Sequence, residues 1–139
     1  MGITQRARNE NACGVHLTGH NISVVFYDRP EFYNWTSQQW ISADNINMKF
    51  LGRGYGCAFY ETASEAYVIL AGGDQGRNTS QILDVKAFLA TGDKNSLVDA
   101  TEGPDLPAVM IDSAQAILDN GSLLMVGSRT SKSVHVLKN

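Results

Sequence analysis

Three histidines and two cysteines are the residues of this chain whose types best suit metal or redox chemistry. His135 is expected on a strand face in the last hairpin, far from the other two in sequence. His16 and His20 resemble a metal-binding pair, but along a strand that rises about 3.3 Å per residue they would lie roughly 13 Å apart. They could share an ion only if a turn began between them, so ordinary strand and turn histidines are the favoured interpretation. Cys13 and Cys57 both fall in predicted strands, which favours two buried reduced thiols over a disulfide between neighbouring repeats.

The glycine-rich segments do not match known catalytic or nucleotide-binding loops. Segment 52–56 lacks the Lys-Ser or Lys-Thr of a phosphate loop and precedes a predicted strand instead of a helix. The turn 74–78 is the nearest approach to a calcium loop and has too few carboxylates. No nucleophile elbow or zinc spacing is present. The sequence therefore indicates no catalytic residues, no metal site and no cofactor, and it favours a protein that is not an enzyme.

Length and charge exclude several classes of partner. With 139 residues the chain fits one domain, and a formal charge of -3 provides no basic field for nucleic acid. No apolar run approaches the roughly 20 residues that a membrane-spanning helix needs. The first residues have no apolar core typical of a signal peptide, which favours the cytoplasm. Secretion is the alternative, because Asn-X-Ser/Thr sequons occur in or beside predicted turns at Asn21, Asn34, Asn78 and Asn120.

The elements that must position any site are short strands and turns. The stretch 66–85 is an apolar run, a glycine pair, a polar turn and a second apolar run, which is typical of a β-hairpin. Weaker copies of this pattern occupy 14–28 and 121–137. Further short strands are expected at 35–41, 54–60, 96–99 and 109–118, with a turn at 29–34 and a connector at 101–107. No sustained helical period occurs apart from a short turn around 113–118, so the predicted class is all-β.

The three hairpins recur at a regular interval. Gly19, Gly73 and Gly127 are separated by about 54 residues each, and a period near 50 with four short strands per unit is typical of propeller blades. The order of the motifs resembles the kelch repeat: Tyr27-Asp28 with Trp35 matches the end of one repeat, and Gly72-Gly73 matches the glycine pair of the next. The second repeat has Leu83-Asp84 in place of Tyr-Asp and no tryptophan, so the match is degenerate.

The resemblance implies a kelch-like β-propeller of about three four-stranded antiparallel blades. A flexible arm would occupy 1–11 and the propeller segment 12–139, with approximate blades at 12–50, 51–102 and 103–139. The first blade is predicted to begin on its second strand and the last blade to lack its fourth. In this family small residues let blades approach near the axis and large aromatics fill the rim. The structural residues implied are Gly72, Gly73, Tyr27, Asp28, Trp35 and Trp40.

Three blades form only part of a ring, since closed propellers usually need four to eight. Two open flanks would carry apolar side chains, so we expect a second copy to complete the ring, or else a longer chain or a protein partner. Some kelch-type propellers, the galactose oxidase group, hold a copper site of Tyr, His and a Cys-linked Tyr. The matching spacing is missing here, so that activity is not implied.

The predicted function is a non-catalytic protein-interaction or ligand-binding module. The alternatives are a small enzyme or carbohydrate-binding protein with its site at the ring axis, and a structural subunit of a larger assembly. Turns 74–78 and 128–132 are expected at one end of the blades, with the turn of the first hairpin in the corresponding place. The candidate binding residues for an acidic or polar partner are His20, Asp74, Arg77, Arg129 and Lys132.

Overall fold

The computed structural model describes residues 12–26, 29–50, 54–73, 78–111, 113–128 and 131–137, and this part of the chain is all-β. Sheet A has the order β1-β2-β3-β4, with β1 (Cys13–Leu17), β2 (Ile22–Phe26), β3 (Pro30–Asn34) and β4 (Gln39–Ser42). Sheet B has the order β5-β6-β7-β8, with β5 (Tyr55–Glu61), β6 (Ala66–Gly72), β7 (Ser80–Asp84) and β8 (Thr101–Glu102). Sheet C has β9 (Ala114–Ile117), β10 (Leu123–Ser128) and β11 (Ser131–Leu137) in sequence order, with β10 in the middle.

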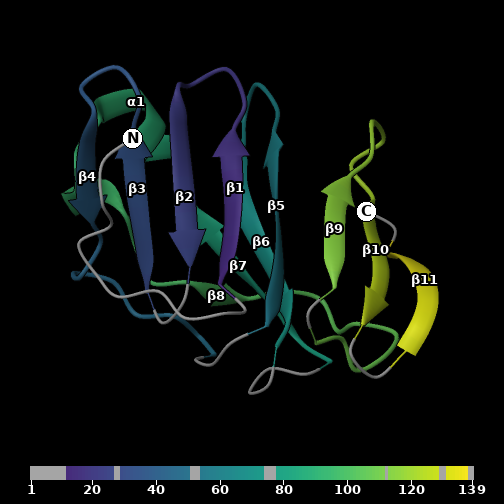
Figure 1. Cartoon of the computed structure of the whole chain (residues 1–139). Coiled ribbons are helices and arrows are strands. Elements are labelled where there is room, and N and C mark those ends of the chain that lie inside the picture. Colours follow the sequence, from purple (N-terminus) through teal and green to yellow (C-terminus); the bar gives the residue numbers. More distant parts are fainter. Residues whose placement is uncertain are drawn as a thin grey trace.

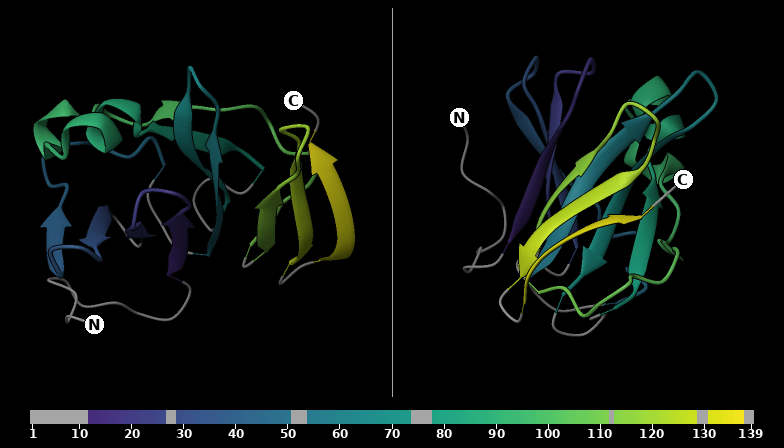
Figure 2. Two further views of the ribbon diagram at one scale, coloured as in Figure 1. Left: turned by 90° about the horizontal axis from the view of Figure 1, so that it is seen from above. Right: turned by 90° about the vertical axis from the view of Figure 1, so that its right-hand side faces the viewer.

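Each sheet is an antiparallel meander whose first strand lies beside the first strand of the next sheet. β1 contacts β5, and β5 contacts β9. These three strands run in the same direction (Figure 1). Seen from above, the three sheets stand side by side along an open arc (Figure 2). The described strands therefore have a blade-like arrangement with β1, β5 and β9 on the inner side, and they do not close a ring.

The larger core lies between sheets A and B. Strand alternation sends Leu17, Val24 and Phe32 of sheet A to the face that meets Val68 and Leu83 of sheet B, and all five are completely buried. The Phe32 ring packs against Phe88, with ring centroids 4.5 Å apart. Removal of these apolar side chains from water supplies most of the free energy that holds sheets A and B together.

A second core lies between sheets B and C. It is formed by Ala58, Ile69 and Ala71 on one face of sheet B and by Leu123 and Met125 on sheet C. The side chains of this core are smaller than those of the first. At its inner end a Cβ on Gly56 would overlap the Gln115 side chain, so glycine at this position lets β9 approach β5 closely.

The segment 29–34 was expected to be a turn and is instead strand β3. Pro30 is tolerated because it is the first residue of the strand, and the turn follows at 35–38. Asn34 ends the strand, since its Oδ1 accepts hydrogen bonds from the backbone N–H groups of Thr36 (2.9 Å) and Ser37 (3.1 Å). Sheet A therefore has four strands and begins on its inner strand, not on its second strand as predicted.

A helix was not expected after β7, yet α1 (Lys86–Thr91) follows it and the 3-10 turn η1 (Lys94–Ser96) comes next. The helix is short and ends at Gly92, whose φ of 70° is left-handed and whose N–H bonds to Phe88 O at 2.7 Å. It is held by the burial of Phe88. The predicted strand at 96–99 is wrong: the fourth strand of sheet B is β8, within the predicted connector. None of the helices in the described ranges has the length and apolar character needed to cross a bilayer.

Candidate functional site

The glycine pair predicted to be structural ends β6. Gly72 and Gly73 have φ values of 76° and 91°, which side chains other than glycine adopt only with strain. A Cβ on Gly72 would overlap the Met110 carbonyl, and Gly73 N donates a hydrogen bond to that oxygen at 2.8 Å. The pair therefore attaches the segment leading into sheet C to the end of β6. The Tyr27-Asp28 pair lies outside the described residues.

Of the predicted binding residues, His20 is the one whose side chain the structure describes. His20 lies in the β1–β2 turn, at the upper end of sheet A in Figure 1. β6 and β7, like β10 and β11, are connected at the lower end. Grouping His20 with turns 74–78 and 128–132 was wrong, because that prediction took β1 for a second strand. Asp74, Arg77 and Arg129 lie outside the described residues, and only the backbone of Lys132 is described, in β11.

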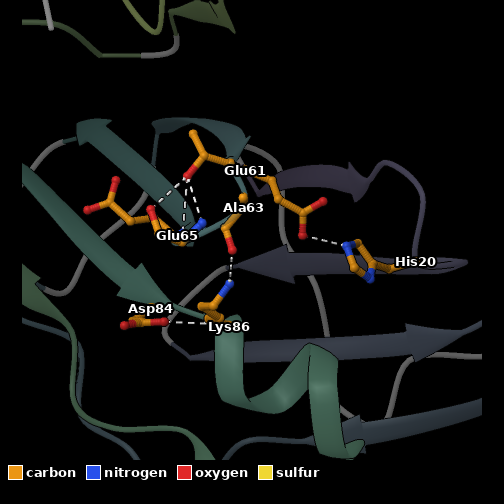
Figure 3. A network of polar contacts seen from close by, with 8 residues as sticks. His20, Glu61, Ala63, Glu65, Asp84 and Lys86 are labelled. Carbon is orange, nitrogen blue, oxygen red and sulfur yellow. Dashed lines mark hydrogen bonds and ion pairs between the residues drawn. The ribbon is translucent and has the colours of Figure 1, made fainter.

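His20 instead connects sheets A and B. Its Nε2 lies 2.6 Å from Oε2 of Glu61 at the end of β5 (Figure 3). Its ring also meets Phe59 edge-on, with ring centroids 6.3 Å apart. The two polar side chains are 27% and 36% exposed, so solvent screens the pair and its contribution to stability is small. Nearby, Lys86 Nζ donates to Ala63 O at 2.9 Å, which ties helix α1 to the β5–β6 turn.

The two cysteines form a disulfide between the inner strands β1 and β5. Their Cα atoms are 6.1 Å apart, within the usual range for such a bridge. Two reduced thiols were the favoured prediction, and the structure replaces it with the alternative. Spacing could not decide between them, because the pairing depends on how closely two sheets approach. The disulfide fixes the inner edge of sheet A to that of sheet B.

The beginnings of the inner strands β1, β5 and β9 line a shallow groove. Its lining holds no Asp, Glu, His, Lys or Arg among the described residues. The groove is about 310 Å³ and is lined by Ala12, Cys13, Gly14, Tyr55, Gly56, Cys57, Ser113, Ala114 and Gln115. Both cysteines are in the disulfide, so neither offers a thiolate. The described lining of this groove is therefore made of small residues, a tyrosine, a glutamine and the disulfide.

The outer face of sheet C is apolar and open. The strand register places six side chains on this face, away from sheet B, and we call them the apolar flank: Ala114, Ala116, Leu124, Val126, Val134 and Val136. Val126, Val134 and Val136 are 43%, 62% and 49% exposed. Scattered exposed valines are ordinary on protein surfaces, but a continuous apolar sheet face is typical of a contact surface.

The outer face of sheet A, at the other end of the arc, has a different chemistry. The strand register places Gly14, His16, Ser23, Val25, Tyr33 and Trp40 on this face, together with Ser42 and the buried Glu31, and Trp35 of the following turn packs on Tyr33. We call Gly14, His16, Ser23, Val25, Tyr33, Trp35 and Trp40 the aromatic flank. Tyr33 is buried between the two tryptophans, with ring centroids 4.8 Å from Trp35 and 4.9 Å from Trp40. Trp35 is 41% exposed, and Ser23 Oγ accepts a hydrogen bond from its Nε1 at 2.9 Å. The tryptophans predicted to be structural thus form one cluster with a hydrogen-bonding edge.

An open pocket of about 350 Å³ separates the outer parts of sheets B and C. Tyr67, Ile69 and Ile82 of sheet B line it together with Leu123 and Leu137 of sheet C. Burial raises the pKa of the Tyr67 phenol, and the nearby Tyr60 and Glu65 raise it further. Neutral tyrosine therefore persists here to higher pH than in solvent.

Comparison of the sequence with protein families and with curated proteins found no match. No protein-family model matches the chain, and no curated protein has a significantly similar sequence. Within the described ranges, no three histidine, cysteine, aspartate or glutamate side chains gather as metal ligands. His16 Nδ1 lies 3.0 Å from Ser23 Oγ, so the two histidines have separate partners.

Sequence reasoning missed Glu61 and Gln115, and it predicted open apolar flanks without naming the residues that form them. Glu61 and Gln115 gave no local signal, because each meets its partner across two sheets. The flank did give a signal: Leu123, Leu124, Met125 and Val126 form an unbroken apolar run, which predicts a strand with two apolar faces.

Proposed function

We propose that this chain is a non-catalytic interaction module, a half-ring of kelch-like propeller blades that a second copy completes. The apolar flank is the observation that carries the proposal. Sheets A, B and C already stack face on face through apolar cores, and the apolar flank offers one more face of the same kind without a neighbour among the described strands. Burying it would remove Val126, Val134 and Val136 from water.

The aromatic flank of the second copy is the surface we propose as its partner. Exposed indole at Trp35 would pack on the valines, because aromatic rings bury large areas with little loss of conformational entropy. On the inner side, Gly14 of one copy would meet Ala114 and Ala116 of the other. Small residues on both strands allow the close approach seen where β9 meets β5 at Gly56. A twofold pair would form two identical contacts, each between the apolar flank of one copy and the aromatic flank of the other, so no flank would stay exposed.

The non-catalytic part of the proposal is supported by the inner groove. Its described lining is small or uncharged, which fits a packed axis better than a reaction site. An enzyme at this position would need ionisable groups with shifted pKa values. Partner binding is then proposed at the turns 74–78 and 128–132, where Arg77, Arg129 and Lys132 would meet an acidic partner.

The test measures native mass by light scattering over a range of concentrations, for the full chain and two matched variants. We expect a dimer of the 15.1 kDa chain, which Val134→Asp dissociates and Val98→Asp does not. Val98 is the control because it is 60% exposed, as Val134 is 62% exposed, but lies outside the flank. A monomer at every concentration would overturn self-association. If Trp35→Ser left the dimer intact, the flanks would pair differently from a ring.

A carbohydrate ligand on the aromatic flank is the second candidate, because Trp35 is exposed beside the polar groups of His16 and Ser23. Sugar rings stack on indole while their hydroxyls bond to such groups. Quenching or blue-shift of tryptophan fluorescence by oligosaccharides, abolished in Trp35→Ser, would favour it. No change with any oligosaccharide tested would remove it.

A further inference from the structure

Four Asn-X-Ser/Thr sequons occur in this chain, and the proposed ring does not explain them. Disulfides form and persist in oxidising compartments such as the secretory pathway. The Cys13–Cys57 disulfide therefore favours passage through such a compartment. In eukaryotic cells the same compartment attaches glycans to asparagine in these sequons.

Asn34 and Asn120 hold their side chains in a way that leaves the reacting nitrogen available. Asn34 Oδ1 accepts hydrogen bonds from Thr36 N and Ser37 N, and Asn120 Oδ1 accepts one from Ser122 N at 3.0 Å. Among the described residues, Nδ2 of neither asparagine makes a hydrogen bond. Asn21 differs, because its Nδ2 donates to Thr36 Oγ1 at 2.7 Å. The Asn78 sequon differs too, because its hydroxyl residue Ser80 is 1% exposed and its Oγ donates to Pro104 O at 2.6 Å.

Neither asparagine side chain is part of a surface proposed to pair. Asn34 stands between Tyr33 and Trp35 of the aromatic flank, but strand alternation turns its side chain to the opposite face of sheet A. Asn34 begins the β3–β4 turn and Asn120 lies in the β9–β10 turn, at the upper end of the sheets in Figure 1. Neither belongs to the apolar flank nor lines the inner groove. A bulky glycan at these turns would extend into solvent.

We propose that Asn34 and Asn120 are N-glycosylation sites and that the chain matures in an oxidising, glycan-attaching compartment. The co-reactant is a lipid-linked oligosaccharide diphosphate. Asparagine Nδ2 forms a bond to the anomeric carbon of the sugar, the bond from that carbon to the diphosphate oxygen breaks, and the lipid diphosphate leaves. One Nδ2 proton is lost in the exchange. Oδ1 is unchanged, so the turn hydrogen bonds at both sites survive the modification.

The experiment expresses the full chain behind a cleavable leader in a eukaryotic cell and measures intact mass before and after an amidase that releases N-glycans. We expect two glycans, with the amidase leaving aspartate at positions 34 and 120 in the peptide map. In the cells that naturally make the protein, an antibody blot with and without the amidase tests the native form, because removal of N-glycans lowers its apparent mass. A chain with unmodified asparagine at both positions would overturn the proposal, whether it is secreted or retained inside the membrane-enclosed fraction.

Matched variants separate glycan loss from misfolding. Asn34→Asp and Asn120→Asp keep an Oδ1 that accepts the turn N–H groups but remove Nδ2, so each should lose one glycan without unfolding. Thr36→Ser keeps both the sequon and a hydroxyl, and should keep the glycan. Loss of a glycan in Thr36→Ser together with its retention in Asn34→Asp would overturn the assignment. Because these readings concern mass, they are independent of whether two copies close a ring.

Discussion

The two interfaces between sheets are built differently. Sheets A and B share the larger core, a disulfide between their inner strands, and the His20–Glu61 pair between their upper ends. Sheets B and C share a core of smaller side chains, and their inner strands approach through Gly56. Between their outer parts lies an open pocket. The first interface is thus fastened at several points, one of them covalent. Across the second, Gln115 Nε2 donates a hydrogen bond to Ala71 O at 3.3 Å, and the rest of the contact is close packing of small side chains.

This difference indicates which part of the molecule needs a neighbour. Sheets A and B have a buried common core with large aromatic side chains, which is sufficient for one stable unit. Sheet C has three strands, one face in the second core and the other face formed by the apolar flank. We expect sheet C to be the less stable blade in the isolated chain, and contact at its flank to stabilise it.

The largest effect should come from the A–B core. Phe32→Ala removes a fully buried ring that packs on Phe88 and should lower the free energy of unfolding by about 3–5 kcal/mol. Denaturant unfolding measures the effect of Phe32→Ala.

Met125→Ala, in the B–C core, should increase hydrogen exchange in sheet C while sheets A and B stay protected. Hydrogen exchange measures the effect of Met125→Ala. Equal loss of protection in all three sheets for Met125→Ala would show that the interfaces are not independent.

The disulfide should have the next largest effect. It joins residues separated by 44 positions, and replacing both cysteines with serine should lower the free energy of unfolding by about 2–4 kcal/mol. Thermal unfolding with and without reductant provides the measurement, with the doubly substituted chain as the control that reductant cannot change. An unfolding midpoint of the unmodified chain that is insensitive to reductant would contradict the claim that the disulfide fastens this interface.

Close fitting at the B–C interface is tested by Gly56→Ala. The added Cβ overlaps the Gln115 side chain, so overpacking should destabilise the chain by about 1–3 kcal/mol. Adding Gln115→Ala should recover most of that loss, because it removes the overlapping atoms. Gly14→Ala on the inner strand of sheet A is the matched control, with both glycine variants made in the Val134→Asp chain so that the proposed contact between copies is absent. Its Cβ would have its nearest neighbour at 3.6 Å, so little change is expected. If the losses in the free energy of unfolding caused by Gly56→Ala and Gln115→Ala were additive, the close approach of β9 to β5 at Gly56 would be contradicted.

The predictable part of the fold is the part encoded in local pattern. Apolar runs joined by glycines and polar turns predicted the hairpins that became β1–β2, β6–β7 and β10–β11. The Asn120-Gly121 turn predicted the hairpin that became β9–β10. The segment 29–34 was mistaken because proline and asparagine suggested a turn, whereas they stand at the two ends of a strand. Helix α1 was missed because six residues are too few for a helical period to emerge.

The candidate site was less predictable, since its contacts join residues remote in sequence. The partner of His20 is 41 residues away and Cys57 is 44 residues from Cys13. Whether such residues meet depends on the packing of whole sheets. Naming the first strand wrongly also moved His20 to the wrong end of the blades, because every turn of an antiparallel meander alternates between the two ends.

The smallest effect should appear at alkaline pH, on the B–C side. Burial raises the pKa of Tyr67 in the folded chain, so folding is favoured by neutral tyrosine below the ordinary value of 10.0. That stabilisation is lost as pH rises from there through the raised pKa, because the unfolded chain ionises first. Tyrosinate absorbance should show one late-titrating phenol that is absent in Tyr67→Phe. Hydrogen exchange should show sheet C loosening before sheets A and B, since Tyr67 lines the pocket between B and C. Simultaneous loosening of all three sheets at high pH would mean that the second interface is fastened as firmly as the first.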